Sequence, residues 1–185
     1  MSADFELRSP SHELLPGYIA AMRAGWSPST TRDVTAEQLA AIEQDANEFL
    51  RDLERPGAPL TLNDGRVVER LPGRTFWMWD GAFCGAINIR YVPGTEGLPS
   101  HVSGHIGYSV VPWKQQRGYA TRALALLLPR ARAITGLPRV LITCDEDNVP
   151  SRKVIEANGG VLCRTEEESD RPGVSKLHFW LSLPE

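Results

Sequence analysis

The sequence is poor in cysteine and has no segment apolar enough to cross a membrane. Cys84, Cys144 and Cys163 are widely spaced and form no Cys-x-x-Cys pair, so we expect reduced core thiols and no metal site. No apolar run approaches the roughly 20 residues that span a bilayer. The N-terminus also lacks the basic and apolar regions of a secretory signal. These absences predict a cytoplasmic protein with no membrane partner.

The chain also lacks an excess of positive charge. Lys and Arg number 20 against 23 Asp and Glu, which gives a formal net charge of −3. A protein that binds nucleic acid over its whole surface must neutralise phosphates with basic side chains, so no nucleic-acid partner is expected. With 185 residues, of which 42% are hydrophobic, the composition is typical of one globular domain.

Residues 1–74 show a mostly helical pattern within that single domain, residues 1–185. Apolar residues recur at three- and four-residue steps around 14–22 and 36–53, which predicts two helices. Thr35 and Gln38 have the spacing of a capping box at the start of the second helix. Proline and glycine then mark a loop or hairpin over the last part of this segment, with its turn at Asn63-Asp64-Gly65.

Residues 75–185 are predicted to form a mixed sheet and the core. Helices are expected over residues 117–136 and 148–158. Strands are expected over residues 75–80, 83–92, 105–112, 139–145, 161–168 and 174–183. The strand, helix and strand over 105–145 form a βαβ unit, whose two strands should be parallel. Pro129 predicts a kink or an early end of the long helix near Ala125. The fold class is therefore α/β.

The turn between the strand and the helix of this unit has the properties of an anion site. Such a turn brings unpaired backbone N–H groups and the positive end of the helix dipole to one point. Gly118 allows close approach of the backbone, Ala120 keeps the first helical turn slim, and Lys114 and Arg117 add positive charge. The turn matches neither the NTP-binding loop nor the dinucleotide fingerprint. The residues alone leave open a phosphate site and an ordinary solvated turn.

The spacing Gln115-x-x-Gly118-x-Ala120 resembles the Gln/Arg-x-x-Gly-x-Gly/Ala signature of the GNAT superfamily of acetyl-CoA-dependent N-acetyltransferases. An apolar strand precedes it, a long helix and a second strand follow, and then come Asn148-x-x-Ser151 and a Gly-Gly stop. The resemblance implies a GNAT-like mixed β-sheet with a central splayed parallel strand pair, flanking helices and a C-terminal β-hairpin.

The same resemblance implies an enzyme that moves an acetyl group from acetyl-CoA to a primary amine. The acceptor would be a small molecule or a peptide, and residues 1–74 would shape its site. Transfer would be direct within a ternary complex, and the protein would be a monomer or a homodimer. The alternative is a non-catalytic CoA-binding or partner-binding module with the same fold, and a nucleotide-binding module that uses the same turn is a third possibility. Turnover of acetyl-CoA, as opposed to binding alone, would separate the first two.

The resemblance also assigns the cosubstrate to residues around the turn. Backbone groups of Val110 and Val111 would pair with the pantetheine arm, and the amides of residues 116–121 would cradle the pyrophosphate. Asn148 would hold the pantetheine, although it is equally expected to cap the following helix. The full set of expected cofactor residues is Val110, Val111, Gln115, Gln116, Arg117, Gly118, Tyr119, Ala120, Thr121, Asn148 and Ser151.

His105 is the first candidate for the general base. It matches the position at which some family members carry a catalytic Glu, and an unperturbed pKa near 6.5 suits proton uptake at neutral pH. Glu96 and His101, in the preceding loop, are rival candidates. A base or a desolvating pocket is needed because only roughly one lysine-like amine in 2,500 is neutral at pH 7.

The usual general acid of the family is missing from the sequence. Many members place a Tyr seven residues after the Asn, and here that position is Ile155. A group is still needed to return a proton to the departing thiolate. Tyr108, Ser151 and water are the candidates that the sequence offers, and the residues alone do not choose among them.

Overall fold

The computed structural model describes residues 4–30, 32–62, 64–167 and 173–184. The strands are β1 (Glu6–Arg8), β2 (Pro59–Thr61), β3 (Val67–Glu69), β4 (Gly73–Trp79), β5 (Phe83–Arg90), β6 (Ile106–Val110), β7 (Arg139–Asp145), β8 (Val161–Glu167) and β9 (Ser175–Ser182). The helices are α1 (Leu15–Arg23), α2 (Thr35–Asp52), α3 (Tyr119–Thr135), α4 (Val149–Ala157) and the short 3₁₀ helix η1 (Pro112–Lys114).

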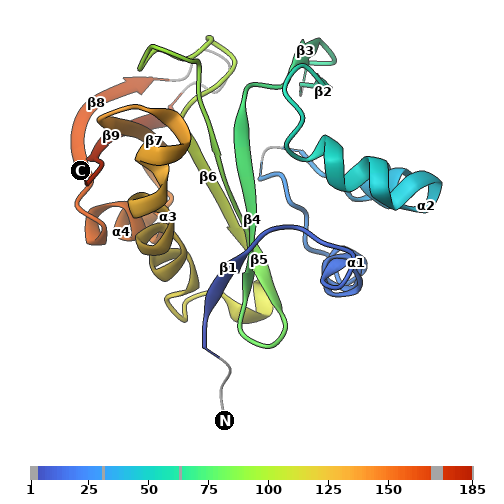
Figure 1. Ribbon diagram of the computed structural model, residues 1–185. Helices are drawn as coiled ribbons and strands as arrows, with labels where there is room; N and C mark the ends of the chain where they lie inside the picture. The colour runs from blue at the N-terminus through green and yellow to red at the C-terminus, as the bar shows by residue number, and fades with distance from the viewer. Residues whose placement is uncertain (1–3, 31, 63, 168–172, 185) are drawn as a thin grey trace.

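The strands form antiparallel ladders in three sheets. The larger two have the orders β1-β4-β5-β6 and β7-β9-β8, and β2 pairs with β3 as a hairpin. Helices α1 and α2 lie on one side of the four-stranded sheet, and α3 and α4 lie on the other (Figure 1). Apolar side chains of the sheet alternate between two cores, one beneath α1 and α2 and one around α3. The expected α/β class is confirmed, with antiparallel strands at both ends.

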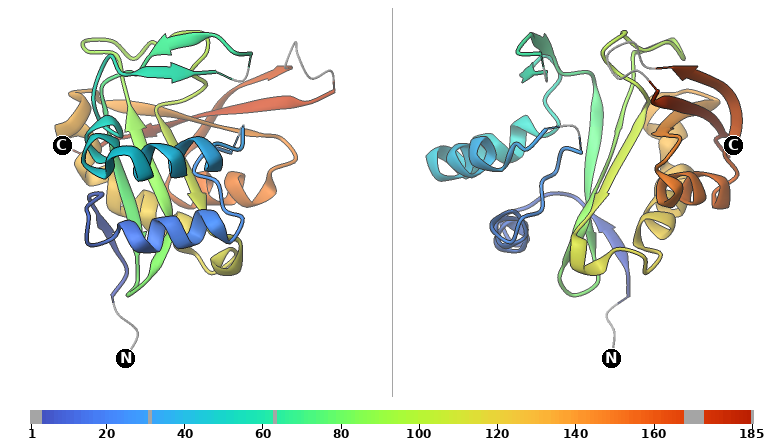
Figure 2. Two further views of the ribbon diagram at one scale, coloured as in Figure 1. Left: turned by 90° about the vertical axis from the view of Figure 1, so that its right-hand side faces the viewer. Right: turned by 180° about the vertical axis from the view of Figure 1, so that it is seen from behind.

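The N-terminal part is less helical than its pattern predicted. Its two helices begin and end within two residues of the expected ranges, and the expected hairpin is the pair β2 and β3. Of the predicted turn, Asp64 and Gly65 lie in the described part of the chain and Asn63 lies outside it. Strand β1 was missed, because three residues that alternate between exposed and buried give too short a pattern. Figure 2 shows both N-terminal helices against the sheet.

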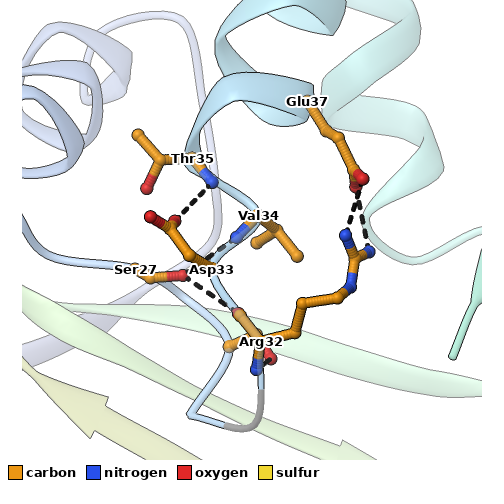
Figure 3. A network of polar contacts seen from close by, with 7 residues as sticks. Ser27, Arg32, Asp33, Val34, Thr35 and Glu37 are labelled. Carbon is orange, nitrogen blue, oxygen red and sulfur yellow. Dashed lines mark hydrogen bonds and ion pairs between the residues drawn. The ribbon is translucent and has the colours of Figure 1, made fainter. Parts of the chain in front are cut away.

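Helix α2 begins without the predicted capping box. The Asp33 carboxylate accepts a hydrogen bond from the Thr35 amide at 2.9 Å (Figure 3). The Gln38 amide, which a capping box would bond to the Thr35 side chain, donates to the Val34 carbonyl oxygen instead. The Gln38 side chain is engaged elsewhere, because its oxygen accepts a hydrogen bond from the Tyr18 hydroxyl. The Arg32 guanidinium pairs with Glu37 at 2.6 Å and closes the same network. These bonds fix the connection between α1 and α2.

Helix α3 extends past its internal proline. Pro129 has no N–H to donate, so the Ala125 carbonyl oxygen loses its helical partner. Both residues are on the exposed side of the helix, where water can satisfy that oxygen. The predicted early end near Ala125 is therefore wrong, and the helix ends at Thr135, before Gly136 in the left-handed conformation.

The cysteines are free thiols, as expected, but they are not all in the core. Cys84 and Cys144 are buried, whereas Cys163 is exposed on β8. The Cys163 thiol donates to the His178 carbonyl oxygen at 3.2 Å. Among the described residues, no group of His, Cys, Asp and Glu is placed to hold a metal ion. Within the same residues, no helix combines the length and the hydropathy that a membrane crossing requires.

Gly85 is the glycine at which the central sheet is most sensitive to substitution. Its φ is +144°, and an added Cβ would lie 2.2 Å from the Ser109 carbonyl oxygen. We expect Gly85→Ala to lower the free energy of unfolding in urea by more than about 3 kcal/mol, because strand β6 cannot move away without breaking its ladder. Gly65→Ala is the matched control, with φ +81° and open space around it, and should cost about 1 kcal/mol. Equal losses would contradict the close-approach explanation.

Candidate active site

Strands β6 and β7 meet at one end only. The His105 amide donates to the Leu141 carbonyl oxygen at 2.7 Å, and the Leu141 amide donates to the His105 ring at 3.0 Å. No β6–β7 ladder exists among the described residues, and each strand is the edge of its own sheet. The expected parallel direction of the pair remains a prediction. The open edge of β6 is the place where an extended ligand can pair with backbone groups.

The alternation of β6 decides which of its residues have free backbone groups. The Val111 amide donates to the Cys84 carbonyl oxygen at 3.0 Å, so Val111 faces β5. In an antiparallel ladder the neighbouring residue then faces the opposite edge. The backbone of Val110 therefore faces the open edge, where the Gln115 side chain donates to its carbonyl oxygen at 3.1 Å. Of the two strand residues expected to meet a ligand, only Val110 presents its backbone.

The turn before α3 presents several amides to one region. Gln116 has a φ of +58° and Gly118 a φ of +78°, so the chain reverses sharply before helix α3. Within the described part of the chain, no acceptor meets the N–H groups of residues 116–121, and the first helical bond is from Arg122 to Gly118. An added Cβ at Gly118 would meet nothing within 4 Å. Free amides and the positive helix end around an open space form an anion cradle.

Lys114 does not add its charge to this cradle as expected. Its ammonium pairs with Asp80 at 2.7 Å and donates to the Cys84 sulfur at 3.3 Å. The Tyr119 hydroxyl donates to the other oxygen of Asp80. Burial alone would raise the pKa of Asp80, but the bonds from Lys114 and Tyr119 lower it to about 2. Asp80 was not a candidate in the sequence, although a carboxylate at a hairpin tip is a signal that could have been followed.

Asn148, Ser151 and Tyr108 come together across the gap between the sheets. The Asn148 side chain accepts a hydrogen bond from the Ser151 amide at 3.1 Å. Asn148 therefore caps α4, which is one of the two roles expected of it. The Ser151 hydroxyl lies 2.8 Å from the Tyr108 hydroxyl. Burial raises the pKa of Tyr108 to about 12, even though the Ser151 hydrogen bond lowers it. The pair is therefore neutral and can hold or relay a proton.

His105 is placed poorly for a general base. Its side chain is fully buried, and burial together with the Arg90 charge lowers its pKa to about 4. The ring nitrogen Nδ1 accepts from the Leu141 amide, so the neutral ring carries its proton on Nε2. Nε2 has no partner among the described residues. This ring joins two strands and has no free lone pair to offer.

The other catalytic candidates have separate positions. The Glu96 carboxylate accepts two bonds from Arg139, at 2.8 and 3.0 Å, and hydrogen bonding to Arg139 lowers the pKa of Glu96. His101 is half-buried in the same loop. Ile155, at the position of the usual family Tyr, is a fully buried core residue against α3. The Ser151 and Tyr108 hydroxyl groups are thus the proton donors that the structure places together at the gap.

Comparison with known proteins gives one family. Residues 6–161 match the family model described as an acetyltransferase (GNAT) domain. No protein with a curated description matches the sequence.

Solved structures of similar fold extend over nearly the whole chain. RimJ of Mycobacterium smegmatis in complex with CoA-disulfide has 22% identity and a TM-score of 0.62, and the match covers 97% of this chain and 82% of that one. A Vibrio cholerae spermidine N-acetyltransferase chimera with the human enzyme has 12% identity and a TM-score of 0.65, over 97% and 96%. A Salmonella typhimurium acetyltransferase that modifies the N-terminal serine of ribosomal protein L7/L12 has 14% identity and a TM-score of 0.62, over 99% and 97%. At these identities the likeness concerns the fold.

The tautomer and pKa of His105 can be tested without a substrate. We expect nitrogen NMR to show a ring protonated on Nε2 that titrates near pH 4. The folded pKa lies below the ordinary 6.5, so the unfolded chain binds the extra proton first, and stability is lost as the pH falls from 6.5 towards 4. His105 should account for about 3 kcal/mol of that loss. In urea unfolding at pH 6.5 and pH 4, His105→Gln should lose about 3 kcal/mol less unfolding free energy between the two pH values than the wild type. The same loss in the variant and in the wild type would contradict the lowered pKa of His105.

Proposed function

Since the chain belongs to the GNAT family of acetyltransferases and is an acyltransferase, we propose that it moves an acetyl group from acetyl-CoA to a primary amine. Transfer is direct, within a ternary complex. The observation that carries the cosubstrate assignment is the row of unaccepted amides at residues 116–121 around the open left-handed Gly118. The proposal also holds that the acceptor is a small molecule or a peptide.

The residues around the turn fit a CoA pyrophosphate. The free amides at the start of α3 would donate to it, and the exposed Arg117 would add the charge that Lys114 gives to Asp80 instead. The open edge of β6 at Val110 would receive the pantetheine arm as an added strand, with Gln115 yielding its carbonyl bond. Acetyl-CoA, when bound, supplies a thioester whose acyl group an amine can take.

Ser151 is proposed as the donor that protonates the departing thiolate. As the new C–N bond forms and the C–S bond breaks, the Ser151 hydroxyl gives its proton to sulfur and recovers one from Tyr108 or water. The amine proton passes to water, because the His105 ring has no free lone pair. Reaching the neutral amine costs about 4–5 kcal/mol at pH 7, and a desolvating pocket can offset that cost.

The cosubstrate site is tested by calorimetric titration with acetyl-CoA. We expect micromolar binding by the wild type and a loss of at least a hundredfold in Gly118→Glu, whose carboxylate would enter the cradle and repel a pyrophosphate. Gly136→Glu is the matched control, because Gly136 ends the same helix with φ +71° and open space. Its affinity should stay within threefold. No binding by the folded wild type would overturn the proposed function.

The proton donor is tested by steady-state kinetics on an amine that the protein acetylates. Ser151→Ala should lower kcat by a factor of 10² or more, with acetyl-CoA affinity within threefold, because the lost group acts on the leaving thiolate. Ser151→Thr retains a hydroxyl and should recover most of the rate. An unchanged kcat in Ser151→Ala would assign that proton to water, and acetyl-CoA binding without turnover of any amine would favour the non-catalytic module.

A further inference from the structure

Arg90 lies on the face of the four-stranded sheet that carries α1 and α2. Asn88 on the same strand and Gly107 of β6 lie on this face too. They are an even number of residues away from Ala86 and Val111, which pack under α1 and α2, and side chains alternate between the two faces along a strand. A Cβ added to Gly107 would lie 3.5 Å from both the Arg90 guanidinium and the Asn88 side-chain oxygen. The absence of a side chain at Gly107 thus leaves space above these two polar groups.

Within the described part of the chain, the guanidinium of Arg90 has neutral hydrogen-bond partners. Its Nε donates to the Gly104 carbonyl oxygen at 2.9 Å, and its Nη1 donates to the Asn88 side chain at 3.2 Å. No carboxylate of the described residues forms an ion pair with it. The side chain is mostly withdrawn from water, and that burial disfavours its charged form. Since an arginine has five N–H donors, at least two here remain available to a ligand.

The groups nearest to Arg90 do not compensate its charge. The Arg90 amide donates to the His105 carbonyl oxygen at 2.8 Å, and the His105 ring is neutral at pH 7. The Glu96 carboxylate, which acts on the His105 ring, is bound to Arg139. A largely buried cation that has no counter-ion among the described residues is costly, and an anion on a ligand offsets that cost. The planar guanidinium has the geometry that binds a carboxylate through two parallel bonds.

The Arg90 guanidinium lies beside Gly107, one residue before Tyr108 of the proposed proton donor pair. Gly107 directly precedes Tyr108, whose hydroxyl meets Ser151 on the opposite face of the sheet. The next residue, Ser109, accepts from the Trp26 indole at 2.8 Å, so the connection between α1 and α2 borders the same surface. A small acceptor can therefore place one group at Arg90 while its amine reaches the open edge of β6.

We propose that Arg90 and Asn88 bind the carboxylate of the acceptor, so that the substrate is a small amine that carries a carboxylate, such as an amino acid. This inference rests on the proposed acetyl transfer. A polyamine places positive charge near the same guanidinium and is disfavoured at this subsite. The amide of the acceptor acid keeps the shape but loses the charge and is bound more weakly.

The test compares matched acceptors with the wild-type protein and acetyl-CoA. Phenylalanine, phenylalaninamide and phenethylamine share a ring and an amine and differ in the carboxylate, and alanine with its amide and ethylamine form a smaller set. We expect kcat/KM for the carboxylate member of at least one set to exceed that of its partners tenfold or more. Equal or higher values for the amide or the amine overturn the inference, as does turnover confined to spermidine or a peptide N-terminus. Turnover of no amine overturns the proposed function with it.

Variants then locate the carboxylate. Arg90→Gln should raise KM for the carboxylate acceptor at least tenfold, while KM for the uncharged amide changes less than twofold and acetyl-CoA affinity is unchanged. Arg74→Gln is the matched control, because Arg74 on the neighbouring strand is exposed and already pairs with Glu54. It should leave both KM values unchanged. Arg90→Lys keeps the charge and serves if the Gln variant does not fold. An equal rise in KM for the amide in the tested Arg90 variant would mean that Arg90 acts on the fold.

Discussion

The separation of β6 from β7 is the constraint on which the site depends. Backbone groups at a sheet edge must find partners, in water or in a ligand. Two hydrogen bonds at His105 and Leu141 hold the strands together at one end. At the other end β6 continues into the amide-rich turn, and α4 brings Ser151 to Tyr108 across the gap. A single arrangement thus supplies the open strand edge, the amides and the hydroxyl group on which the proposed function rests.

Charge is distributed differently from the pattern of basic residues. Lys114 and Asp80 neutralise each other, and Tyr119 binds the same carboxylate, so three elements are fastened together beside the cradle. The positive potential there comes mainly from backbone amides and the helix end. The opposite case is Arg90, a cation that pairs with no carboxylate in the described ranges and lies on the face that we assign to the acceptor. A count of basic residues does not distinguish side chains that form ion pairs within the fold from side chains that can bind a ligand.

The local sequence predicted the structure correctly where residues within one element determine its conformation. The helix pattern of α3, the glycines at its two ends and the cap at Asn148 are local, and each is present at the expected residues. Predictions failed where another part of the chain competed. The Gln38 amide donates to the Val34 carbonyl oxygen instead of to Thr35, and the Gln38 side chain accepts from the Tyr18 hydroxyl. Pro129 is tolerated because it faces water.

The sequence by itself determined the order of the core elements, the turn that opens α3 and, through Gln115, Gly118 and Ala120, the family. These depend on periodicity, backbone freedom and spacing, which are properties of short segments. Only the tertiary structure decided that His105 joins two strands, that Lys114 is paired, and that the Arg90 guanidinium bonds to Gly104 and Asn88. The physical reason is that ionisation and hydrogen bonding depend on burial and on partners far away in the chain, which no local pattern contains.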